Sequence, residues 1–390
     1  MIQSVLDNDL YKFTMQQAVH SLYPRAEVRY EFINRGETPF PDSFSKRLQQ
    51  QVDGMADLQL QTDELDYLRE TCYFLTPVYL DFLTHYRFDP KNVVIDQIDG
   101  KLKILISGPW YKTILWEVPL LAMISELYFS MTAPKTLSRE QGRQLNIQKG
   151  EQLRDGGIDF ADFGTRRRFS AKNQELVIKD ILSVENNTMI GTSNVYLAKA
   201  TGIKPIGTHA HEWFMFHAAE HGYKRANMAA IDAWSTVFRG HLGIALTDTY
   251  TTDLFLKSFD SVEARLFDGV RQDSGDPFVF VDKLVAHYQK LRINPLTKTI
   301  VFSDDLDTEA AISIKDYCRG KINASFGIGT NLSNDLGVQP LNIVIKLCQC
   351  RIHADTVWIP MVKLSDTEGK HTGDADEIEL CLRIVQRSSL

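Results

Sequence analysis

The stretch Gly207-Thr208-His209-Ala210-His211-Glu212-Trp213 joins a short strand-like run to a helix-like run. Residues 203–206 (Ile-Lys-Pro-Ile) precede it, and residues 213–220 after it have the composition of a helix. In α/β proteins, catalytic and binding side chains gather where a strand ends and a helix begins. The stretch therefore indicates an α/β fold and makes its two histidines the first candidates for chemistry.

Short β-rich runs recur from residue 158 onward, and segments of helical composition separate most of them. The eight runs are 158–163, 188–193, 203–208, 242–248, 264–272, 299–304, 322–327 and 341–346. Strands alternating with helices predict right-handed crossovers and a parallel sheet, and eight strands suggest a (β/α)₈-like barrel. Only about ten residues separate the second and third runs, at the lower limit for a full crossover, so we expect an irregular barrel.

The first part of the chain has a different pattern, in which strand-like and helix-like segments are mixed and helices dominate the end. The sequence predicts an N-terminal α+β domain over residues 1–150 and an irregular α/β-barrel domain over residues 151–350. Residues 351–390 are rich in turns. We expect this tail to return to the first domain.

Composition limits the classes of partner. The 390 residues carry a net charge of -7, which argues against broad binding to nucleic acid or to membrane surfaces. The apolar stretch 114–129 predicts a buried helix too short to span a bilayer, and residues 1–7 lack the features of a signal peptide. Five cysteines without a framework spacing indicate a reducing, cytoplasmic setting.

The two histidines of the opening stretch admit three interpretations. On an extended strand His209 and His211 share one face, and this spacing suits a barrel metallohydrolase that binds zinc. Such a site needs further ligands, and no later histidine ends a candidate strand. A buried histidine without chemistry is the second interpretation. In the third, His211 is a nucleophile oriented by Asp248 at a neighbouring strand end.

Two other strand ends carry residues that suit a hydroxyl-rich anion. Arg271 and Asp273 precede a Ser-Gly turn and an Asp-Pro helix start, so a cation and a carboxylate share one strand end. Asp304 belongs to an acidic group after the next run. Such carboxylates suit ribose hydroxyls or a hydrated Mg²⁺ ion, although helix capping is an alternative for Asp304.

Arginine and glycine gather at two further strand ends. Residues 166–168 are three arginines that follow Phe163 and Gly164, and their planar guanidinium groups suit phosphate oxygens. A solvated charge run is the alternative. Residues 325–331 (Ser-Phe-Gly-Ile-Gly-Thr-Asn) form a glycine-rich loop whose backbone N–H groups suit a phosphate, unless the loop is a plain turn.

Taken in order, these motifs resemble the nicotinate phosphoribosyltransferase family. The match extends from residues 7–12 to residues 362–366 and includes Gly-Thr-x-Ala-His-Glu-Trp and Arg-x-Asp-Ser-Gly-Asp-Pro. The resemblance implies an irregular (β/α) barrel of the type II phosphoribosyltransferase kind, and a homodimer with active sites at the subunit interface. It also implies NAD salvage: nicotinate and 5-phosphoribosyl 1-pyrophosphate give nicotinate mononucleotide and pyrophosphate, coupled to hydrolysis of ATP with Mg²⁺ through a phosphohistidine.

The resemblance also implies roles for particular residues. His211 is expected to be the phosphohistidine, Asp248 its paired carboxylate, and Asp273 a catalytic carboxylate beside the ribose or Mg²⁺. No direct metal ligand is identified, and His209 receives no role. The substrate contacts it implies are Phe163 and the partner subunit's Tyr11 around the pyridine ring, Arg166 and Arg271 on anionic groups, Asp304 on the ribose or Mg²⁺, and Gly327 and Gly329 on the 5-phosphate.

The choice of base can be argued at Ser193. The related nicotinamide enzymes carry an aspartate near this strand end, whereas residues 191–194 (Gly-Thr-Ser-Asn) contain no acid. A carboxylate here would repel the carboxylate of nicotinate, so its absence favours nicotinate over nicotinamide. The alternatives are a nicotinamide phosphoribosyltransferase and a metallohydrolase using His209 and His211.

Overall fold

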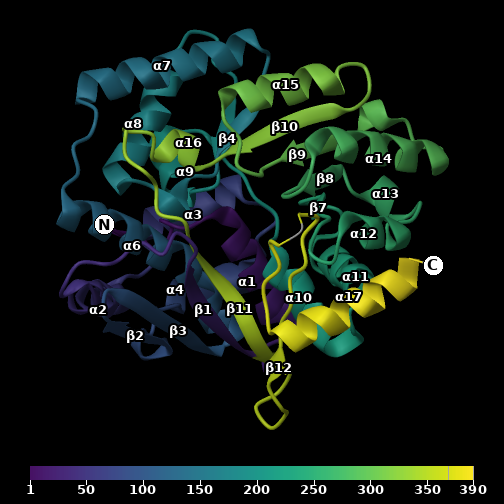
Figure 1. Cartoon of the computed structure of the whole chain (residues 1–390), viewed down its shortest axis with the longest axis horizontal. Helices are drawn as coiled ribbons and strands as arrows, with labels where there is room; N and C mark the ends of the chain where they lie inside the picture. The colour runs from purple at the N-terminus through teal and green to yellow at the C-terminus, as the bar shows by residue number, and fades with distance from the viewer. Residues whose placement is uncertain (368, 390) are drawn as a thin grey trace.

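The computed structural model describes residues 1–367 and 369–389, and its strands form two sheets. The antiparallel sheet has the order β12-β11-β1-β3-β2, and the parallel sheet has the order β6-β5-β4-β10-β9-β8-β7. Figure 1 shows the antiparallel sheet at the lower left and the parallel sheet above it. The chain therefore has the α/β character that the alternating runs predict.

In the antiparallel sheet, β1 pairs with β3 on one side and with β11 on the other. The strands are β1 (Glu27–Asn34), β2 (Val93–Ile98), β3 (Lys101–Pro109), β11 (Ile343–Arg351) and β12 (Ile359–Pro360). The eighth predicted barrel strand, 341–346, thus belongs to β11 in this sheet, and its assignment to the barrel was wrong. The local pattern of residues 341–346 suits a buried strand in either sheet. Pairing with β1, which is far away in the sequence, determines that β11 belongs to the antiparallel sheet.

The other seven predicted runs each overlap a strand of the parallel sheet. These strands are β4 (Phe160–Asp162), β5 (Met189–Thr192), β6 (Lys204–Pro205), β7 (Ile244–Leu246), β8 (Gly269–Gln272), β9 (Thr299–Phe302) and β10 (Asn323–Ile328). The edge strands β6 and β7 do not pair with each other. Side chains bridge the gap, because Thr208 Oγ1 donates to Ile244 O at 3.0 Å and His209 Nε2 accepts from Leu246 N at 3.2 Å. The predicted irregularity is confirmed.

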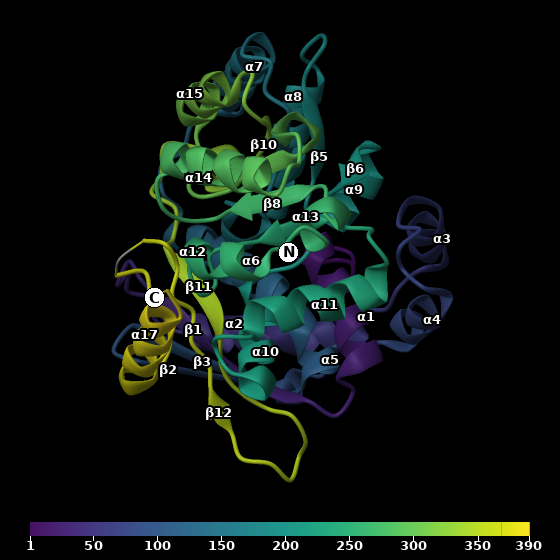
Figure 2. The same ribbon diagram turned by 90° about the vertical axis from the view of Figure 1, so that its right-hand side faces the viewer.

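Helices cover both sheets (Figure 2). In the N-terminal part these are α1 (Leu10–Leu22), α2 (Phe44–Gly54), α3 (Thr62–Thr71), α4 (Pro77–His85), α5 (Trp110–Thr113), α6 (Glu117–Thr132) and α7 (Arg139–Asp155). Around the parallel sheet they are α8 (Ala171–Leu182), α9 (Val195–Thr201), α10 (His211–His221), α11 (Ala226–Phe238), α12 (Thr252–Ser258), α13 (Glu263–Leu266), α14 (Pro277–Lys290), α15 (Thr308–Cys318) and α16 (Thr330–Ser333). The last helix is α17 (Ala375–Ser389).

Helix α1 belongs to both halves of the molecule. The first ten of its thirteen residues are buried. Its N-terminus meets the end of β5, where the backbone N–H of Leu10 donates to Ser193 O at 2.7 Å. The contact brings the residues before α1 to the edge of the parallel sheet.

The most apolar helical stretch of the described chain lies in the core. Trp110–Thr132 is 23 residues long and apolar enough to cross a membrane, and it is longer than the predicted helix 114–129. However, 78% of its most apolar window is buried by the rest of the fold. Burial on this scale is the position of a core helix, as its composition predicts.

The C-terminal tail contacts both sheets. Strand β12 pairs with β11, as the expected return to the N-terminal part requires. Helix α17 instead packs against α12, and Cys381 and Val385 share a small apolar cluster with Tyr250 and Leu254. The tail therefore contacts both parts of the fold, because β12 joins the antiparallel sheet and the apolar face of α17 is covered by α10, α11 and α12. Its assignment to the first domain stays a prediction.

Candidate active site at the ends of the parallel strands

His211 is the first residue of α10 and is 7% exposed. Its Nδ1 lies 3.0 Å from Thr249 Oγ1, and its Nε2 lies 3.0 Å from Asp273 Oδ2. Burial and then the nearby Lys363 ammonium lower the pKa of the ring to about 4. His211 is therefore a neutral imidazole at physiological pH with one polar partner on each nitrogen.

Asp248 lies farther from His211 than predicted. Its Oδ1 is 3.9 Å from His211 Nε2, beyond hydrogen-bond distance, and its Oδ2 accepts a hydrogen bond from Ser274. Lys363 Nζ lies 3.9 Å from the same Oδ2. The carboxylate that bonds His211 is therefore Asp273, from the strand end after β8, and not the expected Asp248.

His209 does not bond to His211 or Asp273 and instead packs in the core. It is fully buried, and its ring packs edge-on against Trp234 at 4.6 Å between centroids. Its Nε2 already accepts the hydrogen bond from β7, and burial holds the pKa of the ring well below its usual value. Among residues 1–367 and 369–389, no group of three or more His, Cys, Asp or Glu side chains could hold a metal ion. The metallohydrolase alternative therefore lacks a ligand set in the described chain.

The three consecutive arginines have three different environments. Both terminal nitrogens of Arg168 lie 2.8 Å from the two carboxylate oxygens of Asp7, and this pair is buried. Arg167 donates through Nε to Ile343 O. The side chain of Arg166 is 42% exposed, with one terminal nitrogen 3.5 Å from Glu117 Oε1. Arg168 is therefore committed to a buried ion pair, whereas Arg166 and Arg167 are partly exposed; the contact of Arg166 with substrate stays a prediction.

The predicted aromatic pair does not need a second subunit to approach the arginine. Tyr11 of the same chain is the largest cause of the raised pKa of Arg166, which places the phenol and the guanidinium close together. The buried α1 carries Tyr11 to the end of β5 in its own chain. The expectation that a partner subunit supplies Tyr11 stays a prediction.

Phe163 and the glycine-rich loop form one packed unit. Gly327 is buried at the end of β10, and a Cβ there would lie only 2.3 Å from the Phe163 ring. A Cβ at Gly329 would lie 3.4 Å from Phe163 O, in ordinary contact. The close approach of the Phe163 ring is thus one reason for the glycine at 327, and the phosphate cradle stays a prediction.

Ser193 has an acidic neighbour that its own strand end does not reveal. Its hydroxyl donates to Asp9 Oδ1 at 2.8 Å, and both side chains are buried. Burial raises the pKa of the Asp9 carboxyl to about 6, although Arg166 opposes the rise. The argument that no acid lies at this strand end was therefore wrong, because Asp9 reaches it from the segment before α1.

Arg271 has a buried donor atom, its Nε, without a hydrogen-bond partner in the described chain. Its charge contributes most to holding the pKa of Asp273 well below the usual value against the effect of burial. Asp304, in contrast, is paired with Lys370 at 3.3 Å. A guanidinium with an unused donor suits an anionic ligand.

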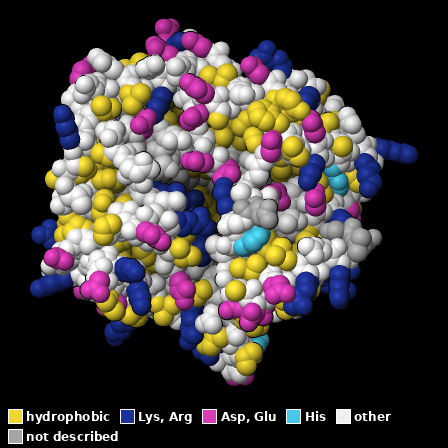
Figure 3. Space-filling model, in the orientation of Figure 1, with side chains coloured by type: hydrophobic (Ala, Val, Ile, Leu, Met, Phe, Trp, Pro, Cys, Tyr) yellow, Lys and Arg dark blue, Asp and Glu magenta, His cyan; other side chains and the backbone are white. Residues whose placement is uncertain are grey.

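Two lysines that are not among the candidates from sequence add positive charge to the site. Lys346 comes from β11, and burial followed by repulsion from Lys363 lowers its pKa to about 7. Lys363 is 8% exposed and comes from the tail. Figure 3 shows Lys and Arg side chains gathered in a hollow near the middle of the face seen in Figure 1. Lys363 lies in residues 362–366, where the family resemblance ends, and this was the sequence feature that could have identified it.

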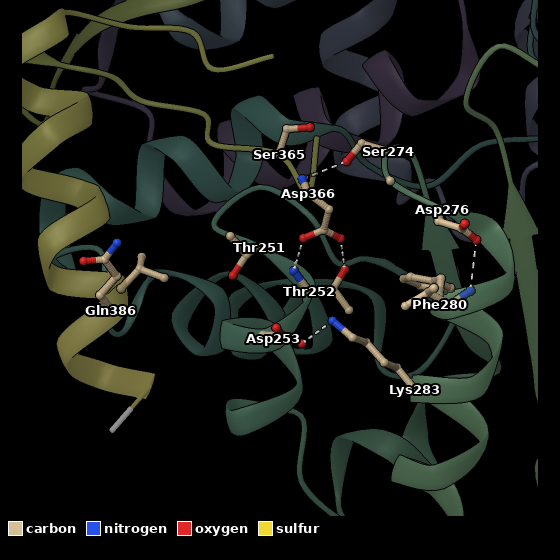
Figure 4. Close-up of a pocket in the computed structure, with 13 residues that line it drawn as sticks. Thr251, Thr252, Asp253, Ser274, Asp276, Phe280, Lys283, Ser365, Asp366 and Gln386 are labelled. Atoms are coloured by element: carbon tan, nitrogen blue, oxygen red, sulfur yellow. Dashed lines mark hydrogen bonds and ion pairs between the residues drawn. The ribbon is translucent and has the colours of Figure 1, made fainter. Parts of the chain in front are cut away.

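A cavity of about 580 Å³ is lined by residues of the loops after β7 and β8 and of the tail, and not by His211. Figure 4 shows Thr252, Ser274 and Asp366 on its wall, with the Asp366 carboxylate bonded to Thr252. The backbone N–H of Asp366 donates to Ser274 Oγ, the hydroxyl that also bonds Asp248. These contacts tie the tail to the loops that follow β7 and β8.

Comparisons with known proteins agree with this architecture. A model of the nicotinate phosphoribosyltransferase family matches residues 158–385, and a model of that family's N-terminal domain matches residues 6–125. A nicotinate phosphoribosyltransferase from Desulforapulum autotrophicum is 59% identical over 387 residues, with 99% of this chain and 100% of the relative covered. One from Chromohalobacter salexigens is 49% identical, with 100% and 99% covered.

Solved structures show the same fold. The nicotinate phosphoribosyltransferase of Porphyromonas gingivalis superposes with a TM-score of 0.97 at 44% identity, over 99% of this chain and 100% of that one. The enzyme from Vibrio cholerae gives a TM-score of 0.91 at 36% identity, over 100% and 94%. Identity at this level over the full length confirms both the resemblance and the expected fold. The chain belongs to the nicotinate phosphoribosyltransferase family.

Proposed function

We propose that the chain joins nicotinate to 5-phosphoribosyl 1-pyrophosphate, giving nicotinate mononucleotide and pyrophosphate for NAD salvage. The observation that carries this proposal is the meeting of a neutral, buried His211 with Asp273 at a strand edge rich in cations. The names of relatives 59% and 49% identical to the chain support the same activity.

The arrangement of charges suits this reaction. The pyridine nitrogen attacks the anomeric carbon while pyrophosphate leaves, so the site needs positioning and anion stabilisation more than a strong base. Arg166, with Tyr11 and Phe163 near it, is proposed to hold the nicotinate. Arg271, Lys346 and Lys363 are proposed to hold phosphate groups, because Arg271 has a buried Nε that is unpaired in the described chain and the two lysines repel each other, and an anion would relieve both conditions.

ATP is proposed to enter through His211. A neutral imidazole can attack the γ-phosphate, and a phosphorylated ring would add about two negative charges beside the cations. Asp273 is exposed enough to reach ribose hydroxyls, and Asp304 can do so if Lys370 moves. Because Mg²⁺ usually takes few protein ligands and several phosphate oxygens, we propose that it arrives bound to the phosphorylated substrates.

Three further points are proposed. The chain forms a homodimer with active sites at the interface, and it works in a reducing cytoplasm, as its five free cysteines favour. The second candidate for the substrate base is nicotinamide, because the Asp9 carboxylate near Ser193 could accept a hydrogen bond from a carboxamide. Protonation of Asp9 instead removes the repulsion toward nicotinate.

The deciding experiment is an assay with 5-phosphoribosyl 1-pyrophosphate and Mg²⁺, with nicotinate or nicotinamide, and with or without ATP. We expect product from nicotinate, stimulated by ATP. ATP labelled at the γ-phosphate should leave acid-labile label on the protein, and His211→Asn should abolish it. His221→Asn, on the exposed end of the same helix, is the matched control. Faster turnover of nicotinamide, or label surviving in His211→Asn, contradicts the proposal.

A further inference from the structure

The two partners of His211 differ in a way that decides where its proton lies. Asp273 is ionised, since its pKa is held low by Arg271, and an ionised carboxylate can only accept hydrogen bonds. His211 Nε2, at 3.0 Å from Asp273 Oδ2, must therefore donate. A neutral imidazole carries one N–H, so Nδ1 is an acceptor and the Thr249 hydroxyl donates to it.

This tautomer cannot form the phosphohistidine at Nε2. The Nε2 lone pair is used in the N–H bond, whereas attack on phosphorus needs a free lone pair. Nδ1 has a lone pair but faces Thr249, which is fully buried. Nε2 faces Asp273, whose side chain is 27% exposed, and is the nitrogen that a substrate can approach. Phosphorylation at Nε2 therefore requires the proton to be on Nδ1.

Thr249 is suited to both states. A hydroxyl donates or accepts according to its rotation, so Thr249 Oγ1 can donate to a bare Nδ1 or accept from a protonated one. Its position is fixed, because Thr249 O accepts from the backbone N–H of Leu364 at 2.8 Å and a β-branched side chain is stiff. An aspartate at this place would instead bind only the protonated nitrogen.

We propose that Thr249 is a positioning residue that lets His211 exchange tautomers, while Asp273 holds the ring in the blocked tautomer until substrate engages that carboxylate. This inference rests on the proposed phosphorylation of His211. The exchange moves one proton from Nε2 to Nδ1 without a change in net charge. In the transfer, the Nε2–phosphorus bond forms and the bond from the γ-phosphorus to the bridging oxygen breaks. ADP leaves with that electron pair. The proton stays on Nδ1, which donates it in a hydrogen bond to Thr249 Oγ1.

The first measurement reads the tautomer directly. Protein labelled with ¹⁵N-histidine, with the His211 signals assigned by their loss in His211→Asn, should show protonated Nε2 in the free enzyme. Adding 5-phosphoribosyl 1-pyrophosphate with Mg²⁺ should shift the proton to Nδ1. A free enzyme already protonated at Nδ1, or spectra that do not respond to the ligand, would overturn the inference.

The second measurement is the rate of phosphorylation by γ-labelled ATP. Thr249→Val keeps the shape and removes the hydroxyl, so the loss of one buried hydrogen bond should slow labelling about tenfold. Thr249→Ser should restore most of the rate. Thr113→Val is the matched control, because the Thr113 hydroxyl is buried and bonds only carbonyls of its own helical turn. Wild-type labelling in Thr249→Val refutes the role of Thr249.

The two proposals fail in different ways. If the wild-type protein takes no label from ATP, the proposed ATP coupling fails, and the ligand-dependent spectra alone decide the inference. If label appears but the tautomer never changes, the inference fails and ATP coupling stands.

Discussion

Gly327→Ala tests whether the glycine-rich loop supports the Phe163 ring or holds a phosphate. The new Cβ would lie 2.3 Å and 2.4 Å from two ring carbons of Phe163. Carbon atoms in contact are about 3.5 Å apart, so the ring must move by roughly 1 Å. Overpacking of this kind costs about 1–3 kcal/mol of stability. A displaced ring that loses about 1 kcal/mol of stacking on the pyridine should raise the KM for nicotinate about fivefold.

The assay varies each substrate separately in steady state. We expect the KM for 5-phosphoribosyl 1-pyrophosphate to change little in Gly327→Ala. The matched variant is Gly329→Ala, whose Cβ would meet Phe163 O only at 3.4 Å and should leave the KM for nicotinate unchanged. Replacing Phe163 by Leu together with Gly327→Ala should recover thermal stability. A rise confined to the KM for the phosphorylated substrate would refute the packing explanation.

Three further outcomes are expected. Arg168→Met leaves the Asp7 carboxylate buried without its partner and should lower the free energy of unfolding in urea by about 3 kcal/mol, whereas Arg167→Met should lower it less. The lowered pKa of His211 means that the ring is protonated only near pH 4, so phosphorylation by ATP should stay constant down to about pH 5 in pulse labelling. An acid limb near pH 6.5 would contradict this. The Asp9 carboxyl, with its pKa raised to about 6, gains a proton as pH falls, so the KM for nicotinate should decrease from about pH 7.5 to 5.5, and Asp9→Asn should remove this dependence.

The sequence predicts the strands well where local pattern is sufficient. Seven β-rich runs become the parallel sheet because each one is short, apolar and followed by a turn. The eighth run has the same local pattern, yet β11 pairs antiparallel with β1. Periodicity reports burial and does not report which sheet provides it. The division of the chain near residue 150 stays a prediction.

The sequence identifies which residues gather at the candidate site but does not identify which of them contact each other. Polar residues at strand ends must meet at one edge of a parallel sheet, so His211, Asp248 and Asp273 could be grouped from sequence. Which carboxylate bonds the histidine depends on about 1 Å of side-chain placement, since the two distances are 3.0 Å and 3.9 Å. Asp9 could not be placed at Ser193 from sequence, because the segment before α1 makes that contact across 184 residues.

The position of β11 in the antiparallel sheet, and not in the predicted barrel, explains how a chain with a net charge of -7 gathers cations at one place. A regular barrel would draw every ligand-binding group from its own strand ends. Here β11 lies in the antiparallel sheet and brings Lys346 close to Lys363 of the tail and to Arg166, which follows β4, and each of these two cations lowers the pKa of Lys346. Burial together with this mutual repulsion destabilises the charged lysine, and a bound pyrophosphate would relieve it. We therefore propose that the open barrel and the second sheet form one anion-binding arrangement, since neither sheet alone supplies all of its cations.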